Sequence, residues 1–309
     1  MPASADTLHV GIDVGTSGVR AVAIDRDGIV HGQASRPMPA PVVESGTVTQ
    51  DPAVWRDAVA AVLRRLGAEV DLGAVASLAV DGTSGTLLLA DADGRPLAPA
   101  RMYDDQSASQ WAPRIAAVAP PESGAHGATS ALGRLLHLQS NHPDARHALH
   151  QADWVAAGLT GRYGFSDENN ALKLGYDPVA RAWPAWMDQL EVRRNLLPEV
   201  REPGTPLGPV SPATVAAFGF APACLVVAGT TDGCASFLAT GAAEVGDGVT
   251  ALGSTLTLKL LSDAPVFAPR FGVYSHRLGS RWLVGGASNT GGKALLRFLT
   301  AERMAELTP

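Results

Sequence analysis

The chain has 309 residues, of which 46% are hydrophobic and 17% are charged. This length and apolar content allow a sizeable core, or the cores of two domains, and exclude a mainly disordered chain. The net charge is −6, from 24 Lys and Arg against 30 Asp and Glu. Such a chain lacks a broad cationic surface for nucleic acid or for an anionic membrane. A small diffusible molecule is therefore the expected partner.

The two cysteines, Cys224 and Cys234, form neither a disulfide framework nor a C-x-x-C metal or redox pair. Residues 1–7 lack the basic start and apolar centre of a signal peptide. No apolar run approaches the roughly 20 residues of a membrane-spanning helix. The sequence thus predicts a soluble protein located in the cytoplasm.

The first motif is residues 9–25, where a short turn joins two apolar runs. A turn of this kind between β-rich runs predicts a tight hairpin, and residues 28–34 are expected to add a third antiparallel strand. Asp13 closes the first run. The turn offers backbone amides and two hydroxyls at one point, from Gly15, Thr16, Ser17 and Gly18. An acid beside such an anion cradle suits a Mg²⁺-phosphate, and an ordinary surface hairpin is the alternative.

The same design recurs along the chain. Residues 75–91 again read as a strand, an aspartate, the tip Gly-Thr-Ser-Gly and a second strand. A looser version at 225–237 places Asp232 after the turn, where a helix is expected to begin, and another at 249–261 predicts a hairpin. Because these turns come in two groups, we expect two related lobes that face a shared cleft.

Helical spacing of apolar residues predicts a helix over 51–66, which begins at Asp51-Pro52. Similar spacing predicts helices over 129–139, 144–159 and 183–197. A cluster of prolines from 198 to 212 is typical of a structured connector. We place the lobe boundary near residue 222, which gives lobes of 1–222 and 223–309.

Seven blocks, in order along the chain, resemble the FGGY family of carbohydrate kinases, and within it the small pentulose kinases of the D-ribulose/xylulose type. They lie at 11–18, 80–86, 151–161, 166–176, 228–233, 252–255 and 285–292. One Gly-Thr-Ser-Gly turn would carry little weight, whereas seven ordered blocks are specific. The resemblance implies an α/β protein with an actin-like, ribonuclease-H-like ATPase fold, whose two lobes close around ATP and a sugar.

The resemblance also assigns roles to residues. It implies that Asp13 positions Mg²⁺ and that Thr16 and its neighbours hold phosphate. Asp232 matches the family's catalytic aspartate, the general base. A second phosphate hairpin is implied at Gly253, Ser254 and Thr255, and sugar contacts are implied at Ser84, Asp105 and Asp232. The family's W-x-D-x-R motif appears here as residues 103–107 without its Arg.

We therefore predict ATP-dependent phosphorylation of a ketopentose at its terminal hydroxyl, with ATP and magnesium as cofactors. D-ribulose is the favoured ketopentose. Family members continue further, with an adenosine-binding segment, so residues 223–309 are expected to be the start of a truncated second lobe. A sugar-binding remnant without an adenosine site is the main alternative, and an actin-like ATPase without a sugar substrate is another. We expect no nucleic acid or membrane partner, and self-association as a homodimer is left open.

Overall fold

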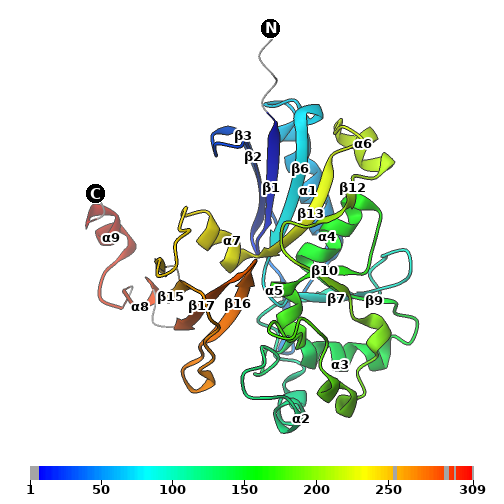
Figure 1. Cartoon of the computed structure of the whole chain (residues 1–309), viewed down its shortest axis with the longest axis vertical. Coiled ribbons are helices and arrows are strands. Elements are labelled where there is room, and N and C mark those ends of the chain that lie inside the picture. Colours follow the sequence, from blue (N-terminus) through cyan, green and yellow to red (C-terminus); the bar gives the residue numbers. More distant parts are fainter. Residues whose placement is uncertain (1–6, 253–255, 289–291, 296, 308–309) are drawn as a thin grey trace. The chain divides into compact units, whose positions relative to one another are not determined.

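The computed structural model contains both helices and strands and describes residues 7–252, 256–288, 292–295 and 297–307 (Figure 1). The chain forms two compact units, residues 1–233 and residues 234–309. The second-lobe start near residue 223 remains a prediction, and the strand that follows it is hydrogen-bonded into a sheet of the first unit. None of the helices in the described ranges has the length and apolar character needed to cross a bilayer.

A six-stranded sheet organises the first unit. Its strands, in spatial order, are β12 (Pro206–Pro209), β13 (Leu225–Thr231), β6 (Val75–Gly82), β1 (Leu8–Val14), β2 (Gly18–Ile24) and β3 (Val30–Pro37). Strands β1, β2 and β3 are antiparallel neighbours, as the sequence predicted, because the short turn after β1 folds the chain back on itself. Strands β1, β6 and β13 are parallel to one another.

Helices cover this sheet. Helix α1 (Pro52–Leu66) confirms the prediction for 51–66, and the Asp51 side chain caps it by accepting the Ala53 amide at 2.9 Å. Its buried stripe packs against β2 and β3. Helix α4 (Gln151–Thr160) packs against β6 and β13, and α6 (Pro212–Phe218) begins at the capping residue Ser211.

A second sheet of five strands belongs to the same unit. Its order is β4 (Val42–Glu44), β5 (Thr47–Gln50), β8 (Ala100–Arg101), β7 (Leu87–Ala90) and β9 (His147–His150). Helix α3 (Ala131–Asn141) packs on β7, which confirms a helix near 129–139. Shorter elements complete the unit: α2 (Ala112–Val118), β10 (Phe165–Asp167), α5 (Glu168–Ala171) and β11 (Glu199–Arg201).

Three local predictions were wrong. Residues 75–91 do not form a hairpin, because β6 joins the first sheet while β7, buried at all four positions, pairs with β8 and β9. The helix predicted over 144–159 begins only at Gln151, since the preceding residues pair with β7 as β9. Residues 183–197 form two 3₁₀ turns, Ala185–Leu190 and Arg194–Leu196, separated by Glu191 at φ 57°.

The second unit contains a four-stranded antiparallel sheet in the order β14 (Gly248–Leu252), β15 (Leu256–Ser262), β17 (Arg281–Ser288) and β16 (Tyr274–Leu278). Helix α7 (Asp232–Leu238) contributes Cys234 and Phe237 to a small core with Leu261 and Leu283. The hairpin expected at 249–261 is present, although Gly253, Ser254 and Thr255 lie outside the described residues. Strands β16 and β17 form a further antiparallel hairpin. Two short helices follow, α8 (Gly292–Leu295) and α9 (Ala301–Leu307).

Candidate active site

Three aspartates meet at the carboxyl edge of the parallel strands β1, β6 and β13 (dark blue, cyan and yellow in Figure 1). Asp13 is the penultimate residue of β1 and lies directly opposite Asp81, the penultimate residue of β6. On the other side Asp81 pairs with Thr230 of β13, and Asp232 follows that strand at once. In α/β sheets this edge is where ligands bind.

Asp81 carries the strongest electrostatic perturbation at this edge. Burial raises the pKa of its carboxyl, and the negative charges of Asp13 and Asp232 raise it further, to about 8. A hydrogen bond also joins the Asp81 and Asp13 carboxyl groups. Asp81 is therefore protonated at neutral pH and can donate to Asp13. Sequence reasoning missed this residue, although it occupies in the second Gly-Thr-Ser-Gly motif the place that Asp13 occupies in the first.

Asp13 and Asp232 are the accessible members of the group. The Asp13 side chain is 36% exposed, and its Oδ2 lies 3.3 Å from Nη1 of Arg20. Asp232 is exposed, opens helix α7 as predicted, and accepts the amide of Gly233 through Oδ1 at 2.7 Å. These two carboxylates are therefore accessible to a ligand, whereas the Asp81 carboxyl is largely buried.

The backbones of β13 and β6 approach each other closely at Gly229, near the end of β13. A Cβ on Gly229 would lie only 1.8 Å from the carbonyl oxygen of Val80, so no other residue fits there without moving the strands. The strand pairing shifts register between Val227 and Thr230 at the same point. The glycine of the A-G-T-T-D-G motif thus brings Asp232 to the edge that holds Asp81.

The block at 166–176 anchors this end of β13. Asp167 caps α5 by accepting the amides of Asn169 at 2.8 Å and Asn170 at 3.1 Å. The Asn169 side-chain amide donates to Oγ1 of Thr230 at 3.0 Å, and both residues are buried. These contacts make Asn169 a positioning residue for the segment that presents Asp232.

The Gly15–Gly18 turn is tightly built. The Gly15 amide donates to the Gly18 carbonyl at 3.0 Å, and the Met38 amide donates to the Ser17 carbonyl at 2.8 Å. Gly18 is required because a Cβ would lie 2.8 Å from the carbonyl oxygen of Arg36. Thr16 is partly exposed and Ser17 is exposed, so both hydroxyls are accessible. Phosphate binding by this turn remains a prediction, as it does for the undescribed turn at 253–255.

The second Gly-Thr-Ser-Gly turn rests on a buried polar network. Oγ1 of Thr83 lies 2.7 Å from Oγ1 of Thr86 and donates to Oε1 of Gln151 at 2.8 Å. The Ser84 hydroxyl oxygen is buried and has no hydrogen-bond partner among the residues that the structure describes. Ser84 therefore keeps its hydrogen-bonding capacity, as the predicted sugar contact requires.

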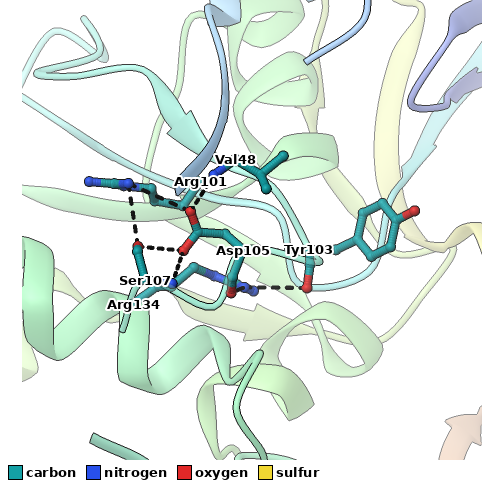
Figure 2. Close-up of polar contacts among 6 residues, drawn as sticks. All are labelled: Val48, Arg101, Tyr103, Asp105, Ser107 and Arg134. Atoms are coloured by element: carbon teal, nitrogen blue, oxygen red, sulfur yellow. Dashed lines mark hydrogen bonds and ion pairs between the residues drawn. The ribbon is translucent and has the colours of Figure 1, made fainter. Parts of the chain in front are cut away.

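Asp105 has a different environment (Figure 2). It is 0% exposed, and its Oδ2 accepts the Val48 amide at 2.7 Å. Its Oδ1 accepts the amide and hydroxyl of Ser107 at 2.9 and 2.5 Å, and Arg101 lies 3.6 Å from Oδ2. In this arrangement Asp105 stabilises its loop. A direct contact with sugar stays an untested prediction.

The acidic edge fits a magnesium ion that arrives with a nucleotide. Among the described residues no three His, Cys, Asp or Glu side chains form a ready metal site. Mg²⁺ commonly uses one or two protein carboxylates and completes its shell with phosphate oxygens and water. The raised pKa of Asp81 shows that negative charge accumulates here, and Asp13 is accessible to a cation that would offset it.

Replacing Asp81 by asparagine should raise the free energy of unfolding more at pH 8 than at pH 5, by ~3–4 kcal/mol. The folded protein holds this proton up to about pH 8, whereas an ordinary aspartate releases it near 3.8. Wild-type stability therefore falls as pH rises through that window, and the variant lacks this loss. Urea unfolding at both pH values measures the difference. The exposed Asp57→Asn is the control, and equal pH slopes in the Asp81 variant and wild type would contradict the assignment.

Comparison with known proteins agrees with this geometry. Residues 8–239 match the N-terminal domain of the FGGY family of carbohydrate kinases. The chain therefore belongs to the FGGY family, and the predicted resemblance is confirmed.

Individual relatives are sugar and polyol kinases by name. Xylulose kinase from Escherichia coli is 26% identical over 292 residues, which cover 89% of this chain and 59% of that protein. Erythritol kinase from Brucella abortus is 30% identical over 271 residues, or 80% of this chain and 51% of the relative. The crystal structure of xylulose kinase from Rhodospirillum rubrum superposes with a TM-score of 0.86 at 23% identity, over 96% of this chain and 65% of that one. The predicted fold class is thereby confirmed, and the chain spans only about half to two thirds of these relatives.

Proposed function

We propose that the protein takes part in ATP-dependent phosphorylation of a ketopentose at its terminal hydroxyl. Membership of the FGGY family and the names of the relatives support a sugar or polyol acceptor. The observation that carries the proposal is the meeting of Asp13, Asp81 and Asp232 at the carboxyl edge of three parallel strands. D-ribulose is the substrate predicted from the sequence, and D-xylulose is the one that the relatives' names suggest. Both sugars and ATP are cytoplasmic metabolites, which favours a cytoplasmic location for the protein.

Asp232 is the proposed general base. Its carboxylate is exposed at the start of α7 and held by the Gly233 amide. It accepts the proton of the sugar hydroxyl while that oxygen attacks the γ-phosphorus of ATP in line. A new P–O bond to the sugar forms, the bond to the bridging β,γ-oxygen breaks, and ADP leaves. The anchoring of Thr230 by Asn169 limits movement of the strand end that presents this base.

Asp13 and Asp81 are proposed to act together in binding the metal ion. A bound Mg²⁺ would neutralise phosphate charge, and Asp13 is the residue proposed to hold it. Protonated Asp81 donates a hydrogen bond to Asp13, which orients that carboxylate and avoids a third negative charge at the edge. The accessible hydroxyls of Thr16 and Ser17 are the proposed phosphate contacts of the first turn.

The substrate is tested with a panel of D-ribulose, D-xylulose and erythritol, measured by ADP release in the presence of Mg-ATP. The proposal predicts release that depends on sugar and is fastest with a ketopentose. ADP release only with erythritol would replace the ketopentose by a polyol. Isothermal titration separates the alternative of a sugar-binding remnant, since binding of a ketopentose without any binding of ATP would favour that remnant.

A further inference from the structure

A cavity of about 330 Å³ lies among helices α1, α4 and α6 of the first unit. This volume falls near the lower end of the range for small-molecule sites. Each helix lines the cavity with residues three or four positions apart, which share one helical face. These residues include Arg56 and Val59 of α1, Trp154 and Gly158 of α4, and Thr214 and Phe218 of α6. The packing of three helices therefore builds the cavity.

The cavity lies at the far end of α4 from the acidic edge. At the start of this helix, Gln151 accepts the amide of Thr83, the residue that follows β6, at 3.0 Å. Near its end, Leu159 lines the cavity, and its carbonyl accepts the Ser211 amide at 2.8 Å. Ser211 comes after β12, which is antiparallel to β13, so it lies near the start of β13. Asp232 follows the other end of β13, and the cavity is therefore separate from the proposed site of phosphoryl transfer.

The walls of the cavity are aromatic and held in place by the fold. Trp154 is 8% exposed, and its ring packs edge-on against Trp55 with centroids 6.1 Å apart. Its Nε1 donates to the Gly94 carbonyl at 2.8 Å. Gly94 has φ 76°, and a Cβ there would overlap the ring of Tyr163. Tyr163 and Phe218 also line the cavity, so three aromatic rings surround a space that suits a flat ligand.

Gly158 keeps this space open. It lies in the interior of α4, is exposed, and lines the cavity. A Cβ at this position would meet no atom within 4 Å, so packing does not require a glycine here. Glycine also destabilises a helix interior relative to alanine. The advantage of glycine at this position is therefore the volume that it leaves to a ligand.

The charged residues that line the cavity are two arginines and one aspartate. Arg56, Arg95 and Asp93 are all exposed. Nε of Arg56 donates to Asp57 at 3.1 Å, and Nη1 of Arg95 lies 3.1 Å from Asp93 and 3.8 Å from Asp91. A guanidinium has five N–H donors, so these contacts occupy only part of each group. Exposed ion pairs of this kind contribute little and exchange readily for the anionic group of a ligand.

We propose that this cavity binds a planar aromatic anion, a ring system that carries one carboxylate or phosphate group. The rings of Trp154, Tyr163 and Phe218 contact the aromatic body of the ligand. The guanidinium groups of Arg56 and Arg95 bind its anionic group. Neither the sugar nor ATP takes part in this binding, so the site does not depend on phosphoryl transfer.

The test titrates ¹⁵N-labelled protein with naphthoate, naphthyl phosphate and the neutral naphthamide. Binding is followed through the indole Nε1–H signal of Trp154, which is identified as the indole signal missing from Trp154→Phe. At least one of the two anions should shift this signal at millimolar concentration, with an affinity at least about fivefold higher than that of the amide. Comparison of the two anions distinguishes a carboxylate ligand from a phosphate ligand.

Gly158→Leu fills the cavity and should weaken binding of the anion at least about tenfold. Ala117→Leu adds the same side chain at an exposed position of α2 and should bind as the wild type does. Leucine forms helix more readily than glycine, so Gly158→Leu should melt no lower than the wild type in the absence of ligand. The melting temperature therefore verifies that this variant folds.

Arg56→Gln provides a second variant at an exposed position, where folding is not at risk. It should lower the affinity for the anion about fivefold and leave the affinity for naphthamide unchanged. A Trp154 signal that responds to neither anion, or unchanged anion affinity in a folded Gly158→Leu, would overturn the proposal. Equal wild-type affinity for the anions and the amide would also overturn it, because the arginines would then select no anion.

Discussion

Replacing Asp232 by asparagine should reduce sugar-dependent ADP release by about a hundredfold or more. The amide has the shape of the carboxylate but cannot accept the proton of the sugar hydroxyl, so the attacking oxygen stays a poor nucleophile. Asp232 is exposed and opens a short helix, so the substitution should leave the fold intact. The rate is measured at saturating Mg-ATP and ketopentose, with sugar affinity followed separately by isothermal titration.

Asp57→Asn is the matched control for this substitution. Its side chain is 68% exposed on α1 and pairs with the neighbouring Arg56, far along the chain from the acidic edge. We expect the control to retain wild-type turnover. If Asp232→Asn also retained near-normal turnover, Asp232 would not be the base, and another group would have to remove the proton.

Replacing Arg134 by methionine should destabilise the first unit by ~3 kcal/mol or more. Arg134 is 1% exposed, and its guanidinium donates to the carbonyls of Tyr103 and Asp105 at 3.3 and 3.0 Å (Figure 2). It also donates to the Gly85 carbonyl at 2.7 Å. Burial lowers the pKa of Arg134 to about 10, so it remains charged at neutral pH. The variant leaves three carbonyl oxygens without their donor and frees the loop at 103–105. Urea unfolding monitored by tryptophan fluorescence measures the loss.

Arg114→Met provides the comparison. Arg114 is exposed on α2 and stacks 4.6 Å above the ring of Trp111, so its loss should cost no more than about 0.5 kcal/mol. Arg134→Lys should recover little of the lost stability, because an ammonium group cannot reach three carbonyls as the guanidinium fork does. An Arg134→Met variant that unfolds at the wild-type urea concentration would show that the loop does not depend on this residue.

Much of the acidic edge could be predicted because its signals are local. Asp13 follows a strand whose apolar residues alternate, and Asp232 stands between a strand and a helix. Helix α1 was predictable for the same reason, since the Asp51-Pro52 start and the apolar stripe lie within one segment. Periodicity and capping act over a few residues, so the sequence displays them directly.

The features that could not be predicted from the sequence depend on contacts between distant segments of the chain. The likeness of residues 75–91 to the opening hairpin concealed that β7 pairs with β9, about 60 residues later. The same pairing converted the start of a predicted helix into a strand. Asp81 became a site candidate only when the strand register set it between Asp13 and Thr230. Asp105 was predicted only as a sugar contact, and its burial involves the Val48 amide from a distant segment and the side chain of Arg101.

The most direct test of the central claim is ³¹P NMR of the protein with Mg-ATP and D-ribulose or D-xylulose. The account predicts that a sugar phosphate and ADP appear in equal amounts, and that ATP stays intact when the sugar is left out. Inorganic phosphate formed at the same rate with and without sugar would contradict it and favour an ATPase without a sugar substrate. So would the absence of any sugar phosphate while both ligands are bound.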